Sequence, residues 1–282
     1  MYEVIFESDL GKKYVFGKNG NTVFDIDFGE GMSVDIGTSQ GFSQIGETVE
    51  SRSVAGRTIK VNGTIYGNDI ASRKRVMRNI LAPFASGRLV FESYYTKVYV
   101  KTAPTFSPVR DDGRFSMQFF APFPFFYGKE ESSVELGGVT PLFKFPVNYA
   151  TPHKFGEKAN EKYSNIVNAG DVKVPFRISL SSNGTSTNPV ISNLTTFEFL
   201  KLNGVLNAGD SIDIYRDEGN VMRVELLSAG VQYDATSWVD ENSTLFELNV
   251  GDNLIAANDD EGGAGLTARF SFNPAVAALY ES

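Results

Sequence analysis

The sequence predicts a mainly β protein of two domains, and three observations carry that prediction. Apolar residues recur at every second position along much of its 282 residues, which is the pattern of half-buried strands. Short strand-like runs alternate with Gly, Asn and Asp turns, as in antiparallel sandwiches. The charge also changes along the chain: residues 1–130 hold 16 basic and 14 acidic residues, a net charge of +2, whereas residues 131–282 hold 10 and 20, a net charge of −10.

The clearest strand lies in residues 56–67, between two glycines. Ile59, Val61 and Ile65 fall on one face of this segment, and the polar residues between them, with Tyr66, fall on the other. The segment is therefore expected to be a strand with one face in a core. Further strands of the first half are expected at residues 89–91, 98–100 and 115–119.

Two predictions concern the chain before this strand. Residues 24–28 alternate apolar and acidic side chains, and the alternation resumes at residues 32–36 after a glycine-rich turn, which predicts a β-hairpin. Residues 37–46 are polar and rich in glycine, which predicts an exposed loop.

One helix is expected after residue 67. Asn68 or Asp69 can cap its first amides, and Pro83 marks its end because proline has no amide hydrogen. The basic residues of this helix are Arg73, Lys74, Arg75 and Arg78. The predicted apolar face holds Val76, Met77, Ile80, Leu81 and Phe84.

The second half is expected to begin with a linker or extended loop at residues 131–165, which includes a short strand near residues 143–147. Residues 166–282 are expected to form an antiparallel β-sandwich. Its predicted strands cover residues 174–180, 197–202, 212–215, 222–227, 246–250 and 266–272.

Composition excludes several kinds of chemistry. The chain has no cysteine, which rules out disulfides, thiolate nucleophiles and zinc–thiolate sites, and its single histidine is His153. A net charge of −8 opposes general binding to nucleic acid or anionic membranes. No apolar run approaches the ~20 residues of a spanning helix, and we expect no signal peptide.

Several motifs occur together in a characteristic order. They are residues 56–67, the arginine-rich helix, the aromatic run of residues 121–128, and then residues 168–178, 188–193, 209–214 and 249–255. In this order the chain resembles the distal tail protein of siphovirus-type phages, a tail component of the baseplate hub family. The resemblance covers nearly the whole chain, and none of its motifs is catalytic.

The resemblance implies a β-sandwich or split-barrel-like N-terminal domain with one helix, residues 1–130, that forms a homohexameric ring. It implies a galectin-like or carbohydrate-binding-module-like jelly roll in residues 166–282. The implied partners are further copies of the chain, in one ring or a stacked pair, the tail tube protein, a tail-associated fibre or lysin protein, and a receptor-binding protein. The implied location is the tail tip of a phage or prophage, after synthesis in the host bacterial cytoplasm, with a role in host adsorption and a channel for DNA.

Aromatic residues concentrate in the first half, where residues 1–130 hold 14 of 23 Phe and 7 of 12 Tyr. Large rings remove much apolar area from water, so this half suits burial between subunits. The residues assigned to a subunit interface are Phe123, Phe125, Phe126 and Tyr127, which either pack internally or meet a neighbour.

Other features have two interpretations each. The cations of residues 73–78 are a solvated helix face or donors of ion pairs to a neighbouring subunit, or else they contact phosphate. The acids at residues 25–27 and 259–261 are either an outward strand face and a flexible tip or a calcium site. Trp238 is either a core residue or a platform for sugar stacking.

Two rival functions remain open. One is a non-catalytic carbohydrate-binding module that assists host adsorption. The other is a polysaccharide hydrolase with two carboxylates, for which Glu157 and Glu161 near His153 are the acid/base candidates against the alternative of a surface loop. We assign no catalytic, cofactor-binding or metal-binding residue, and we expect a structural protein with no cofactor, no membrane contact and no sequence-specific nucleic acid.

Overall fold

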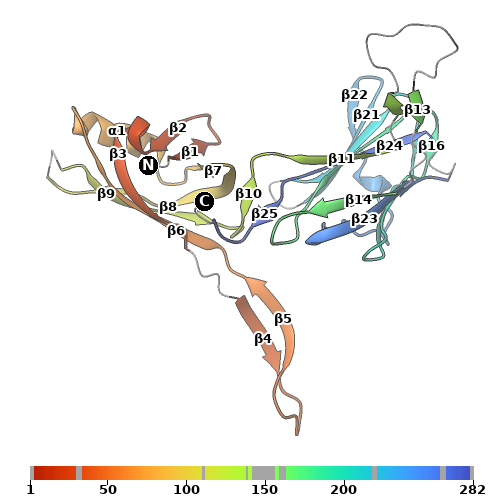
Figure 1. Cartoon of the computed structure of the whole chain (residues 1–282), viewed down its shortest axis with the longest axis horizontal. Coiled ribbons are helices and arrows are strands. Elements are labelled where there is room, and N and C mark those ends of the chain that lie inside the picture. Colours follow the sequence, from red (N-terminus) through yellow and green to blue (C-terminus); the bar gives the residue numbers. More distant parts are fainter. Residues whose placement is uncertain are drawn as a thin grey trace. The chain divides into compact units, whose positions relative to one another are not determined.

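The computed structural model describes residues 3–29, 34–109, 112–137, 139–141, 156–158, 163–217, 221–260 and 265–279. Within these ranges the chain is mainly antiparallel β-sheet with one α-helix, so the predicted fold class is confirmed. The chain divides into two compact units (Figure 1). Unit 1 is Met1–Lys129 with Val276–Ser282, and unit 2 is Glu130–Ala275.

The main sheet of unit 1 has the strand order β2-β1-β7-β8-β9-β6-β3, and β10 pairs with both β8 and β25. Its strands are β1 (Val4–Ser8), β2 (Lys13–Phe16), β3 (Thr22–Asp27), β6 (Arg57–Ile65), β7 (Ser86–Phe91), β8 (Tyr94–Phe106), β9 (Arg114–Ala121), β10 (Phe126–Gly128) and β25 (Ala275–Val276). The 3-10 turn η1 (Lys18–Gly20) joins β2 to β3.

This sheet curls around a core of aromatic rings. The rings of Phe6 on β1 and Phe119 on β9 stack at 5.5 Å between centroids, and both side chains are fully buried. Phe16 on β2 and Phe24 on β3 belong to opposite edges of the sheet, yet their rings lie 5.9 Å apart. The two edges therefore approach each other across the core, as in an incompletely closed barrel.

The glycine-bracketed segment forms strand β6 as predicted. Ile59, Val61 and Ile65 are buried, and Lys60 and Asn62 between them are exposed. β6 pairs with β3 on one side and β9 on the other, so its alternation reflects one face in the core and one outside.

The predicted hairpin of residues 24–36 is wrong. Strand β3 pairs with β6, with Phe24 opposite Gly63, instead of with the residues that follow it. Residues Val34–Ser39 form β4, which pairs with β5 (Thr48–Val54) in a separate two-stranded ribbon. The predicted loop of residues 37–46 thus supplies part of β4 and the turn of this ribbon. Pairing with β6 lets Phe24 and Ile26 pack against the core, which a local hairpin would not provide.

Helix α1 (Ile70–Ile80) is confirmed, together with one of its predicted caps. The Asp69 side chain accepts a hydrogen bond from the Ser72 amide at 3.2 Å, and the helix ends before Pro83. The predicted apolar face is only partly correct. Met77 and Leu81 are buried, whereas Val76 is 49 % exposed and Phe84 is 98 % exposed.

Unit 2 contains two larger sheets with the orders β11-β24-β15-β20-β21-β22 and β14-β23-β17-β18. Burial alternates along strands of both sheets, with Ile178 and Leu180 buried in the first and Ile166 and Ile255 in the second, as in a β-sandwich. The strands of the first sheet are β11 (Ser132–Leu136), β15 (Arg177–Ser182), β20 (Ser211–Arg216), β21 (Met222–Ser228), β22 (Val231–Asp234) and β24 (Leu266–Phe272). Those of the second are β14 (Tyr163–Asn168), β17 (Val190–Asn193), β18 (Glu198–Lys201) and β23 (Gly251–Asn258).

Short ladders complete unit 2. They are β12 (Val139–Pro141) with β13 (Gly156–Lys158) and β16 (Ser186–Thr187) with β19 (Val205–Leu206), and the 3-10 turn η2 spans Thr236–Trp238.

Unit 2 departs from the sequence prediction in two ways. Residues 131–165, expected to be a linker, contribute β11 and the start of β14, because each finds a partner far along the chain, β24 and β23. The strand predicted at residues 246–250 is only a single bridge between Leu248 and Val174, followed by β23. The strand predicted near residues 143–147 lies outside the described residues.

Candidate interaction surfaces

The most exposed part of unit 1 is the ribbon of β4 and β5, which we call the arm and define as residues 34–54. Every residue of the arm is exposed, on both faces of the ribbon. A two-stranded ribbon is marginally stable in water by itself, because it has no second layer to cover its apolar face. The arm therefore has the properties of a segment that is completed by contact with another molecule.

The two faces of the arm differ in chemistry. Strand register places Val34 opposite Val54, Ile36 opposite Arg52, and Thr38 opposite Val49 beyond a β-bulge. Side chains of one face thus include most of the apolar residues of the strands, while Ser, Gly and Asp dominate the other.

The tip of the arm is held by its own hydrogen bonds. The Gly41 amide donates to the Gln44 side-chain oxygen at 2.9 Å, and the Gln44 Nε2 donates to Thr48 Oγ1 at 2.9 Å. On this ordered turn, Phe42 and Ile45 are fully exposed. Two large apolar side chains are therefore presented on a preorganised turn, which lowers the entropy cost of burying them in a partner.

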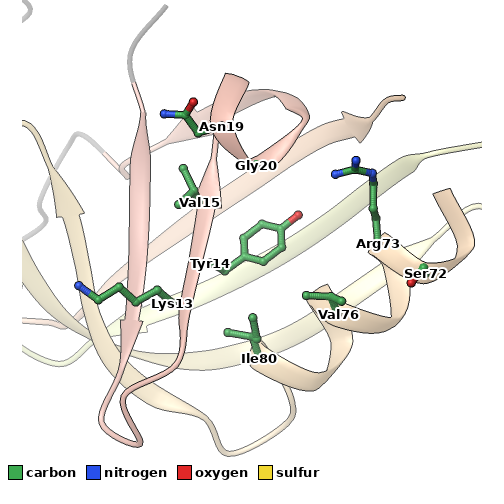
Figure 2. A pocket seen from close by; sticks show the side chains of 9 residues that line it. All are labelled: Lys13, Tyr14, Val15, Asn19, Gly20, Ser72, Arg73, Val76 and Ile80. Atoms are coloured by element: carbon green, nitrogen blue, oxygen red, sulfur yellow. The ribbon is translucent and has the colours of Figure 1, made fainter. Parts of the chain in front are cut away.

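A groove of about 270 Å³ lies between strand β2, turn η1 and helix α1 (Figure 2). Its lining residues are Lys13, Tyr14, Val15, Asn19, Gly20, Ser72, Arg73, Val76 and Ile80. Figure 2 shows the Tyr14 ring between the strand and the helix, with Val76 and Ile80 on the helix facing it. The exposed Val76 is thus one wall of an apolar groove.

Polar groups surround this apolar floor. The Asn19 amide and side chain both donate to the Glu3 carboxylate at 3.0 Å, which fixes the rim at η1. Lys13 pairs with Glu7 at 2.6 Å on the other strand of the β1–β2 pair, and Arg73 stands over the groove from the helix. The groove combines apolar walls with a charged rim, on which Lys13 is paired with an acid and Arg73 adds a second cation.

Burial of the Tyr14 ring predicts a pH effect on stability. Desolvation raises the pKa of Tyr14 to about 12, against the opposing influence of the Arg73 charge. Above pH 10 the unfolded chain loses this proton first, so the folded state binds more protons and stability falls as pH rises toward 12. At pH 11 the loss is about 1.4 kcal/mol relative to pH 8.

Urea titrations of wild type and Tyr14→Phe at pH 8 and pH 11 measure this contribution. The wild type should lose about 1.4 kcal/mol more than the variant, because other titrating groups are common to both. Equal losses in the two proteins would show that Tyr14 ionises as it does in water.

The basic residues of helix α1 are partly engaged within unit 1. The Lys74 Nζ lies 5.6 Å and the Arg78 guanidinium 4.8 Å from the ring centre of Phe106 on β8. The sequence interpretation missed Phe106, which lies about 30 residues further along the chain. Arg75 is exposed, and the Arg73 Nε donates to the Asn68 carbonyl at 3.1 Å.

The aromatic run assigned to a subunit interface divides into inner and outer residues. Phe126 is buried, with its ring 5.6 Å from Phe28 and 4.7 Å from the Arg57 guanidinium. Tyr127 packs at 5.8 Å against Tyr95. Phe125 is half-buried, and Phe123 is 48 % exposed.

In unit 2, Trp238 is half-buried in turn η2. Its ring lies against the backbone of Gly204, where an added Cβ would approach the ring to 2.1 Å. The Asn203 amide also donates to the Trp238 carbonyl at 2.6 Å. One ring face is thus occupied by the chain itself.

The acidic segments lie in ordinary structural settings. Asp25 and Asp27 are on the exposed side of β3, where Asp27 lies 3.5 Å from Lys60. Asp259 is not part of a flexible tip, because it is buried and accepts a hydrogen bond from Ser186 at 2.6 Å. In the described part of the chain no three acids or histidines come together as a metal site.

Some candidates cannot be placed. His153, Glu161 and Glu261 lie outside the described residues, and Glu157 falls in β13, of which only the backbone is described. For the hydrolase candidates, the described residues therefore provide no distance or contact that would join them in one site.

The first sheet of unit 2 carries a polar network on β15, β20 and β21. Asp213 accepts hydrogen bonds from Arg177 at 2.5 Å and from Ser179. Burial alone would raise the pKa of Asp213, but these donors outweigh it and hold the pKa below its usual value. Arg177 also lies 4.9 Å from the Tyr215 ring, and Tyr215 donates to Glu225 at 3.0 Å. Each charged or polar side chain of this network has a partner within it, so the network stabilises the sheet.

Across the described ranges, no helix has the length and apolarity required to cross a membrane.

Comparison with known proteins agrees with this architecture. Residues 169–273 match the family described as siphovirus-type tail component, C-terminal domain. The whole fold is similar to the crystal structure of the SPP1 Dit protein (gp 19.1), with a TM-score of 0.67 and 14 % identity, covering 96 % of this chain and 98 % of that one. No curated protein sequence matches the chain.

Chains of two further structures share the fold, those of the phage P2 baseplate in its activated conformation with Ca and with Sr. The TM-scores are 0.54 and 0.53, at 14 % identity and 99 % coverage of both chains in each case. The chain therefore has the fold of phage tail proteins of the baseplate hub. Within that class, the resemblance to a distal tail protein is confirmed, by sequence for residues 169–273 and by fold for the whole chain.

Proposed function

We propose that this protein is a structural, non-enzymatic hub at the tail tip of a phage or prophage. In this proposal, copies of unit 1 close into a homohexameric ring, in one layer or two stacked layers, around a channel for DNA. The ring joins the tail tube protein to a tail-associated fibre or lysin protein and to receptor-binding proteins, and so serves host adsorption. The protein would be made in the host cytoplasm and would have no cofactor.

The observation that carries this proposal is the likeness of the fold over nearly the entire chain to SPP1 Dit, whose structure is described as a paradigm of the hub adsorption apparatus in phages that infect Gram-positive bacteria. The family match in unit 2 supports it independently, because it rests on sequence.

Exposed apolar side chains on unit 1 favour lateral self-contact. Tyr99 on β8 and Phe120 on β9 are cross-strand partners on the outer side of the sheet, and both are exposed. Phe123 is the exposed member of the aromatic run. Clusters of exposed rings mark interaction sites on soluble proteins, so these residues suit an interface that closed cyclic symmetry would cover.

Glycan binding through Trp238 is not favoured as a second function. The Trp238 side chain is half-buried and one face of its ring lies against Gly204, which leaves less of the ring for stacking on a sugar. We assign unit 2, in this proposal, to docking of neighbouring tail proteins.

The solution mass of the intact protein tests the hub proposal. Light scattering coupled to size exclusion, at micromolar protein, is expected to give six or twelve times the chain mass of 30.9 kDa. The negative-stain image of the same fraction should show a ring with a central hole. A monomer at these concentrations would contradict the proposal.

A further inference from the structure

We propose that the arm of one copy docks its tip in the β2–α1 groove of a second copy of this chain. This inference rests on the proposed ring, and it names the surfaces that hold neighbouring copies together. It follows from two features of unit 1 that are each incomplete: a ribbon with no described layer over its apolar face, and an apolar groove that is open to solvent.

The sizes of the two surfaces agree. Phe42 and Ile45 extend from an ordered turn and are fully exposed. The groove has a volume of about 270 Å³, and its apolar lining residues include Tyr14, Val76 and Ile80. This volume accommodates one aromatic or branched side chain, with the other apolar side chain of the arm tip at the rim. Phe42 in the groove would cover the half-exposed Val76 and complete the contact of the Tyr14 ring.

The charges agree as well. The arm carries Asp35, Glu47 and Glu50 against one cation, Arg52, for a net charge of −2. Helix α1 carries four cations and no acid, for a net charge of +4, and one of these cations, Arg73, stands over the groove. Glu47, next to the tip, is the acid best placed in sequence to meet that rim. Such complementarity selects the partner and its register.

The length of the arm, and the place where it leaves the sheet, favour docking in the groove of a second copy over docking in the groove of the same chain. The six residues of β4 span about 20 Å, and a unit of this size has a radius of gyration of about 14 Å, so an arm reaches an adjacent subunit. The arm leaves the sheet at the end of β3 and β6 where Asp27 pairs with Lys60. Turn η1 of the groove lies at the other end of these strands, next to Thr22, which pairs with Ile65. An arm in its own groove would have to turn back along its own sheet.

Disulfide trapping tests the inference without background, because the chain has no cysteine. The variant with Phe42→Cys and Val76→Cys is oxidised and run on a denaturing gel. The expected result is a covalent ladder that ends at the hexamer, since each arm links to the next copy. Either single variant should give at most a dimer. Phe42→Cys with Phe197→Cys, a site in unit 2 that is more exposed than Val76, should give no ladder.

Three outcomes overturn the inference. A fast-migrating monomer would mean that the arm occupies its own groove. Rings of full mass by light scattering before oxidation, with no ladder afterwards, would mean that neighbours meet through other surfaces, while the hub proposal stands. A wild-type monomer without cross-links would overturn both proposals together.

A charge exchange gives a second, independent readout. Glu47→Arg or Arg73→Glu alone is expected to raise the concentration at which rings half-dissociate by about tenfold, and the double variant should restore much of that loss. The matched control is Glu92→Arg, an exposed acid in the β7–β8 turn. Additive losses in the double variant would show that the two residues do not meet, and would overturn the proposed register.

Discussion

Phe119→Ala is expected to lower the free energy of unfolding of unit 1 by about 3–5 kcal/mol. The Phe119 side chain is fully buried, stacks on Phe6 and meets the edge of the Phe16 ring at 6.4 Å. Its strand lies between β6 and β8, so the backbone is held on both sides and the cavity left by the ring cannot easily collapse. The variant should also weaken closure of the curled sheet, because it removes the ring that joins β1 to β9.

Urea unfolding followed by far-UV circular dichroism measures this loss. Trp238, the single tryptophan, lies in unit 2, so its fluorescence follows that unit and separates the two transitions. Phe84→Ala is a matched control, because the same deletion at a 98 % exposed position of unit 1 should cost about 1 kcal/mol or less. Equal losses for the two variants would contradict the assignment of Phe119 to the core.

Gly87→Ala is expected to destabilise unit 1 by at least about 3 kcal/mol. Gly87 lies in β7 opposite Ser8 of β1, and an added Cβ would approach the Glu7 carbonyl oxygen to 2.1 Å. That oxygen belongs to the backbone, so no rotamer change relieves the overlap, and β1 must move away from β7. Because β1 carries Phe6 into the core, the displacement also loosens the aromatic packing.

Thermal unfolding and amide hydrogen exchange of β1 measure this displacement. The amides of Val4–Ser8 should exchange faster in the variant, while those of unit 2 keep their protection. Gly184→Ala is the control, because a Cβ there meets nothing within 4 Å. Unchanged exchange in β1 would mean that β1 and β7 are not packed as closely as described.

The local elements followed directly from the sequence. Strand β6 was predictable because its alternation, Ile59 to Ile65, matches the two-residue period of a strand with one buried face. Helix α1 was predictable because Asp69 and Pro83 supply the start and stop signals that backbone hydrogen bonding requires. The distal tail resemblance was also available, because it rests on the order of motifs along the chain.

Partners of strands were not predictable in the same way. The pattern of residues 24–36 is compatible with a local hairpin, yet β3 pairs with β6 because only that register brings Phe24 against Phe16. Likewise β11 and β14 find their partners more than 80 residues away. Alternation specifies which face of a strand is buried but not which strand lies beside it.

The candidate interaction surfaces show the same difference between what local sequence predicts and what depends on distant segments. By itself the sequence determined the β-rich class, the helix and the charged helix face, since each depends on residues close together in the chain. It also determined the family resemblance, which depends on the order of motifs along the chain. Only the tertiary structure decided that Tyr14 and Val76 form a groove, that Phe106 lies beneath Arg78, and that residues 34–54 are an arm exposed on both faces. The physical reason is that burial and exposure of an apolar side chain depend on which distant segments pack over it, and local patterns do not contain that information.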